Sequence, residues 1–162
     1  MTEVIMKRVE DTASITDKLV NDVVVRYTKD LDSYVRFVRE CLCDGAQPPT
    51  DDELTDFCLN LATYIYFSST AVETVGIRDD ISKAVWKETY NKHRDSLTTG
   101  TVADKNSKAE MMAQEEELIN NVYHRAYAIM KAKVNAAQEL LSSCKKVLSH
   151  RDNEKQLTRI GG

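Results

Sequence analysis

The sequence predicts an all-α protein: a long antiparallel helical hairpin, with helices at about 51–97 and 102–150, plus an N-terminal helix, assembling as an oligomer. Glycine is scarce (five residues) and proline occurs only as the pair Pro48-Pro49, so a β-rich protein would lack turn residues. Charged residues make up 30% of the chain, which helices tolerate well. Apolar residues recur every three or four positions, the period of a helical face. We therefore expect no strands.

The N-terminal helix is predicted over about residues 15–43. Ser14-x-x-Asp17 is typical of a capping pair at its start. Gly45 then suits a left-handed C-cap, and Pro48-Pro49 prevents the helix from continuing. One apolar stripe follows the helix: Val20, Val24, Tyr27, Leu31, Tyr34, Val38 and Cys41.

The second helix is predicted to begin after the capping box Thr50-x-x-Glu53, with further acidic residues in its positive first turn. The helical pattern continues from there to about Leu97. Gly76 is the weak point of this stretch, where we expect a kink or a short break.

The third helix is predicted over about residues 102–150, because Gly100 can close the preceding helix and Thr101 with Asp104 can cap the next. A polar tail, residues 152–162, follows it. The apolar stripe of this helix comprises Leu118, Val122, Ala126, Ile129, Ala137, Leu140, Cys144 and Val147.

Self-assembly is the main functional expectation from the pattern. Helices of roughly 46 and 48 residues, each roughly 70 Å long, must fold back on one another across a short turn. Apolar residues spread around more than one face of the second helix, so one hairpin partner cannot cover them all. We expect other subunits to bury the remainder, through an oligomer interface that includes Val122, Ala126, Ile129 and Leu140.

The charge of the chain is unevenly distributed. The net charge is −4, but residues 1–60 carry seven basic and 13 acidic side chains, a balance of −6. Residues 121–162 carry eight basic and three acidic side chains, a balance of +5. This polarity indicates an acidic and a basic contact region. The acidic region 1–45 is either an arm that selects partners or a third bundle helix packed permanently on the hairpin, residues 50–151.

No pattern of catalytic or ligand-binding residues stands out, and we expect neither an enzyme nor a cofactor or metal. The five glycines are too far apart for a phosphate-binding loop. The cysteines, Cys41, Cys43, Cys58 and Cys144, show no scaffold spacing and are expected to be reduced. No apolar run approaches the roughly 20 residues of a membrane span, and the N-terminus lacks a signal-peptide core, so we expect a cytoplasmic protein, in the host cytoplasm if viral.

A basic and aromatic face is the informative feature of the second helix. Lys83, Lys87, Tyr90 and Arg94 fall at spacings of four, three and four, and Trp86 lies four residues before Tyr90. Cations that meet phosphates, interleaved with rings that stack on bases, suit single-stranded nucleic acid. The alternative is a solvated basic face with Trp86 and Tyr90 in a subunit contact.

Residues 60–151 resemble the phage recombination mediators of the UvsY type. The resemblance rests on Lys92-x-Arg94 followed by five residues and Gly100, between two long helices, and on the ending Val147-Leu148-Ser149-His150-Arg151. It implies a non-enzymatic ring of identical subunits that binds single-stranded DNA through Lys92 and Arg94. Such a protein helps to load a RecA-like recombinase onto strands covered by single-strand-binding protein. The acidic helix of about residues 1–50 has no counterpart in that family.

Two other functions fit the same pattern. One is a phage structural or scaffolding coiled-coil protein without a nucleic-acid role. The other is a small terminase-like ring protein that binds duplex DNA, although residues 1–60 contain no convincing helix-turn-helix.

Overall fold

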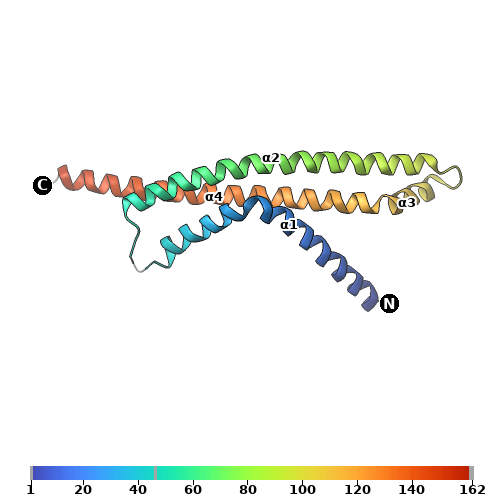
Figure 1. Ribbon diagram of the computed structural model, residues 1–162, viewed down its shortest axis with the longest axis horizontal. Coiled ribbons are helices and arrows are strands. Elements are labelled where there is room, and N and C mark those ends of the chain that lie inside the picture. The colour runs from blue at the N-terminus through green and yellow to red at the C-terminus, as the bar shows by residue number, and fades with distance from the viewer. Residues whose placement is uncertain (1, 46, 161–162) are drawn as a thin grey trace. The chain divides into compact units, whose positions relative to one another are not determined.

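The computed structural model of the protein describes residues 2–45 and 47–160 (Figure 1). The described residues are 92% helical and form no strand. They form four helices: α1 (Thr2–Cys43), α2 (Asp51–Ser96), α3 (Val102–Met112) and α4 (Gln114–Ile160). Helices α2 and α4 pack together. The predictions of an all-α fold and of a long helical hairpin are therefore confirmed.

The helix starts that bound the hairpin follow the predicted capping chemistry. At α2, the Thr50 hydroxyl accepts from the Glu53 amide (3.2 Å), while the Glu53 carboxylate accepts from the Thr50 amide (2.7 Å). Thr101 and Asp104 make the same reciprocal pair at α3. Gly100 adopts a φ of 104°, the left-handed conformation that favours glycine in the turn between helices. All three local predictions are confirmed.

The predicted start of the N-terminal helix is wrong. Helix α1 begins at Thr2 instead of residue 15, so Ser14 lies inside it and does not cap it. The segment before Ser14 contains neither glycine nor proline to stop a helix. The hydroxyls of Thr12 and Thr16 also donate to the carbonyls of Arg8 and Thr12, so these polar side chains are satisfied within the helix.

Two glycines act differently from the prediction. Gly45 does not adopt a positive φ, so it is not a left-handed C-cap; a Cβ there would lie 2.8 Å from the Cys41 carbonyl oxygen. Gly76 does not break α2, which is continuous from Asp51 to Ser96. A Cβ at residue 76 would lie 3.0 Å from Cε2 of Tyr127 on α4. A Cβ would thus clash with the backbone at residue 45, whereas at residue 76 it would press on a side chain that must shift slightly.

The predicted third helix is divided and extended. It is interrupted at Ala113, whose amide donates to the carbonyls of Ala109 (3.1 Å) and Glu110 (3.2 Å). Three glutamates in the first turn of α4 favour a new helix N-terminus at that place. At the other end, α4 runs through Ile160 instead of ending near residue 150, so the predicted polar tail is helical as far as it is described. Residues 161–162 lie outside the described part of the chain.

Contacts divide the chain into two units. The first unit comprises Met1–Arg26 and Val72–Ile129, and the second comprises Tyr27–Ala71 and Met130–Gly162. Each unit contains one stretch of α1, one of α2 and one of α4.

The core of the first unit is made of small side chains. Its buried apolar residues are valines and alanines: Val20, Val24, Val72, Val75, Ala109, Ala113, Val122 and Ala126. Polar contacts between α2 and α4 accompany them. Ser82 is buried and lies 3.3 Å from the Asn120 side chain, and the Asp79 carboxylate lies 3.1 Å from Nδ1 of His124.

The core of the second unit contains larger side chains: Leu31, Val38, Leu54, Phe57, Leu61, Ile65, Met130, Val134, Ala137 and Cys144. Ion pairs add to this packing. Asp32 of α1 pairs with Lys133 of α4 and accepts from the buried Thr28 hydroxyl, while Asp51 of α2 pairs with Arg151 and Lys155 of α4. This unit therefore combines apolar burial with charged contacts between helices.

Candidate nucleic-acid interface

The predicted basic face lies on a continuous stretch of α2. Lys83, Lys87 and Arg94 are exposed and Tyr90 is half-buried. Because α2 has no break before Ser96, the spacings of four, three and four place these side chains on one face. The helix therefore brings four of the five predicted site residues together.

Tyr90 and Arg94 form a local cluster with an acidic neighbour. The guanidinium carbon of Arg94 lies 6.0 Å from the centre of the Tyr90 ring, at the outer limit of a cation–π contact. Nε and Nη2 of Arg94 also donate to the same carboxylate oxygen of Asp95, both at 3.2 Å. A phosphate that binds Arg94 must therefore compete with Asp95 for its hydrogen-bond donors.

Lys92 is exposed but lies on a different face. Residues two apart on a helix point roughly 200° away from one another, and α2 remains helical through Ser96. Lys92 and Arg94 could meet one ligand in two ways: by fraying of the helix end, or by contact between neighbouring subunits. The helix end does not fray in this structure. The other way, contact between neighbouring subunits, remains a prediction.

The hairpin turn adds a cation that the sequence pattern did not identify. A groove of about 430 Å³ at the turn is lined by Arg94, Asp95 and Leu97 from one side and by Val102, Lys105 and Asn106 from the other. Arg94 and Lys105 thus border one groove. Helical periodicity could not relate them, because the turn at Gly100 separates the two helices. Residues 83–108 contain six basic and three acidic side chains, and this local excess of positive charge is the sequence signal that indicates a basic region at the hairpin turn.

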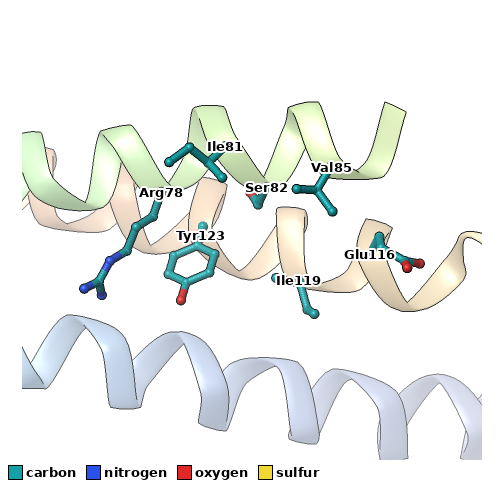
Figure 2. A pocket seen from close by; sticks show the side chains of 7 residues that line it. All are labelled: Arg78, Ile81, Ser82, Val85, Glu116, Ile119 and Tyr123. Atoms are coloured by element: carbon teal, nitrogen blue, oxygen red, sulfur yellow. The ribbon is translucent and has the colours of Figure 1, made fainter. Parts of the chain in front are cut away.

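An apolar groove of about 300 Å³ lies nearby along the hairpin. Figure 2 shows that its lining side chains come from one stretch of α2 and one of α4, with Arg78 and Glu116 at its two ends. Ile81, Val85 and Ile119, which line its middle, are all exposed, with 58% of the Ile81 surface accessible. One chain therefore leaves large apolar side chains uncovered here.

The four predicted interface residues of α4 differ in exposure. Val122 and Ala126 are buried in the core of the first unit, Leu140 is half-buried, and Ile129 is 42% exposed. Packing within one chain already buries Val122 and Ala126. A subunit interface through these four residues remains a prediction, and Ile129 offers it the most surface.

No cluster of three or more His, Cys, Asp or Glu side chains suited to a metal ion occurs in residues 2–45 and 47–160. The four cysteines are free thiols, and burial raises the pKa of both Cys58 and Cys144. A raised pKa leaves less of the nucleophilic thiolate at neutral pH. Within the described helices, none has the length and apolar character needed to cross a membrane.

Comparisons with protein-family models, with curated proteins and with solved structures found no match to this chain.

Proposed function

We propose that the protein is a non-enzymatic, oligomeric single-stranded-DNA-binding protein of the recombination-mediator type, which helps to load a RecA-like recombinase. The observation that carries the DNA-binding part is the face of Lys83, Lys87, Tyr90 and Arg94 on an unbroken stretch of α2. The resemblance of residues 60–151 to the UvsY type supports the mediator role.

Single-stranded DNA suits this face better than duplex DNA. A single strand presents phosphates and unstacked bases together, which matches cations that alternate with an aromatic ring. Lys105 extends the charge across the hairpin turn, beside Arg94. The face contains no group of donors and acceptors arranged for one base sequence, so binding should tolerate any sequence.

Self-assembly supplies affinity that one chain lacks. A few cations on a chain of net charge −4 bind a strand weakly. An oligomer repeats the basic face, and a strand that contacts several copies gains avidity without new contacts. The exposed Ile81, Val85 and Ile119 of the first unit are the surface we assign to contact between subunits.

The apolar surface also favours a second candidate function, a structural or scaffolding protein that assembles without DNA. Assembly through Ile81, Val85 and Ile119 fits both functions, so these residues do not distinguish a DNA-binding mediator from a scaffolding protein. Binding to DNA does separate them. A preference for duplex over single strands would instead favour the terminase-like ring protein.

The test is fluorescence anisotropy with labelled single-stranded and duplex oligonucleotides at two salt concentrations. We expect tighter binding to single strands, with the logarithm of affinity falling by roughly 0.7 per decade of salt for each phosphate neutralised. Lys87→Ala with Arg94→Ala should weaken binding and flatten the salt slope. Lys18→Ala with Arg39→Ala, two exposed cations of α1, is the control with the same change of charge.

Two further variants sharpen this test. Asp95→Asn removes the carboxylate that occupies Arg94, so it should tighten DNA binding, whereas Arg94→Ala alone should weaken it. Lys92→Ala measures how much the opposite face of α2 contributes. Equal affinity in the Lys87–Arg94 double variant and the wild type would contradict the DNA-binding proposal and favour the scaffold.

A further inference from the structure

A third groove, of about 610 Å³, lies in the second unit where α1 ends and α2 begins. Tyr34 and Phe37 of α1 and Phe57 of α2 line it, and Pro48-Pro49 of the linker borders it. It is larger than the apolar groove of the first unit and contains none of the residues assigned to DNA.

Aromatic rings form the wall of this groove. The Phe37 and Phe57 rings meet edge to face with centres 5.9 Å apart, and the Tyr34 and Phe37 rings are 5.8 Å apart. The Tyr34 ring also lies 5.1 Å from the Tyr64 ring. Phe57 is buried, but Phe37 is 49% exposed, so one ring of a fixed cluster is open to a ligand.

The rim of the groove is acidic. Its acidic lining residues are Glu53 and Asp56. Residues 44–56 contain three further acidic side chains, which do not line the groove, and no basic one. The Glu53 carboxylate is engaged in the helix cap with Thr50, and Asp51 forms ion pairs with α4. Asp56 is exposed. Burial raises the pKa of Tyr34, and the nearby Asp56 carboxylate adds to the increase.

Among the described residues, Asp51 alone of the five acidic side chains of residues 44–56 forms an ion pair with cations of the same chain. Arg36 and Arg39 of α1 lie roughly 200° and 140° around the helix from Tyr34, away from the groove. Arg151 reaches the start of α2, where it bonds to the Pro49 carbonyl and to Asp51. A negative rim over an aromatic wall therefore remains available to a cationic partner.

We propose that this groove, which we call the aromatic–acidic groove, is a docking site for an arginine-rich segment of a partner protein. A guanidinium stacks on an aromatic face and pairs with a carboxylate at its edge, so one arginine can contact Phe37 and Asp56 together. Lysine has no planar group and satisfies only the charge. The acidic rim repels phosphate, so nucleic acid is not the ligand of this groove. The inference goes beyond DNA binding and does not depend on it.

The probe is fluorescein-labelled octa-arginine, titrated with the 162-residue chain and followed by anisotropy. Octa-lysine and octa-glutamate serve as the comparison peptides. We expect octa-arginine to bind more tightly than octa-lysine, and octa-glutamate not to bind. Phe37→Ala and Asp56→Asn should each weaken octa-arginine binding by about two- to fivefold, because each removes one exposed contact.

Matched controls separate the groove from general surface charge. Glu73→Gln removes another exposed carboxylate of α2, and Phe67→Ala removes another exposed ring. Neither should change octa-arginine affinity. The Phe37 and Asp56 variants should retain single-stranded-DNA binding, so failure of one proposal is distinguishable from failure of the other.

Three results would overturn the docking proposal. The first is equal affinity of the wild type and of the Phe37→Ala, Asp56→Asn double variant for octa-arginine. The second is equal affinity for octa-arginine and octa-lysine, since charge alone would then explain binding. The third is a lower oligomer mass for the Phe37→Ala variant, which would assign the groove to a second copy of this chain.

Discussion

The two units of the protein use different side chains for the same helical packing. The second unit buries leucine, isoleucine, phenylalanine and methionine and adds ion pairs at Asp32 and Asp51, whereas the first unit buries valine and alanine. Of the 21 large apolar side chains exposed among the described residues, 15 belong to the first unit and six to the second. The first unit thus leaves more large apolar side chains exposed than the second.

This difference suggests a division of roles between the units. Small residues in a core allow helices to approach closely, but they bury little apolar area per residue. The larger apolar residues of the first unit, such as Ile77, Ile81 and Ile119, face outward instead. Exposed apolar patches of this kind mark surfaces that other molecules cover. We therefore expect the second unit to stabilise the chain and the first to mediate assembly.

The largest expected effect comes from placing a charge in the first unit's core. Val122→Asp should unfold the protein, because a buried carboxylate without a partner costs several kcal/mol. Ile129→Asp lies seven residues further along α4 at an exposed position, so it should leave the fold intact and affect assembly only. Circular dichroism and thermal unfolding measure the difference. Loss of helicity in both variants would contradict the distinction between core and surface.

Truncation of core side chains should affect the two units unequally. Leu61→Ala in the second unit should lower the free energy of unfolding by about 2–5 kcal/mol, because Leu61 is fully buried. Val75→Ala in the first unit removes fewer atoms and should cost about 1.6 kcal/mol plus a smaller cavity term. Urea unfolding of both variants checks this order, and a larger loss for Val75→Ala would reverse our assignment of the stabilising unit.

Acid should weaken the second unit through Asp51. Hydrogen bonds from Lys155 and Arg151 hold the pKa of Asp51 below its ordinary value of 3.8. This contribution is therefore present above about pH 4 and is lost as the pH falls through the lowered value. The melting temperature of the wild type should exceed that of Asp51→Asn at pH 7, and the gap should close below pH 4. A gap that is the same at pH 7 and pH 2 would show that the Asp51 ion pairs do not stabilise the fold.

Local chemistry made much of this fold predictable from the sequence. The Thr50–Glu53 and Thr101–Asp104 boxes and the left-handed Gly100 each depend on a few neighbouring residues, and all three form as expected. Gly76 was mispredicted because its role depends on the Tyr127 ring of another helix. No property of its neighbours in sequence indicates that contact.

The candidate sites also differ in whether they depend on residues near in sequence or on contacts between helices. Lys83, Lys87, Tyr90 and Arg94 lie within three turns of one helix, so their common face follows from spacing. Lys105 joins Arg94 only through the turn, and the aromatic–acidic groove combines rings of α1 and α2 that are about 20 residues apart in sequence. Such contacts depend on tertiary packing, which helical periodicity does not specify.

The most direct test of assembly through the first unit is the mass of the protein in solution, measured by light scattering on the wild type and on Ile81→Asp. We predict a wild-type mass above that of a dimer of 18.4 kDa chains, and a folded, smaller species for Ile81→Asp, whose side chain is exposed in the first unit. Phe67→Asp, an exposed position of the second unit, is the control and should keep the wild-type mass. A monodisperse wild-type monomer at micromolar concentration would contradict the account.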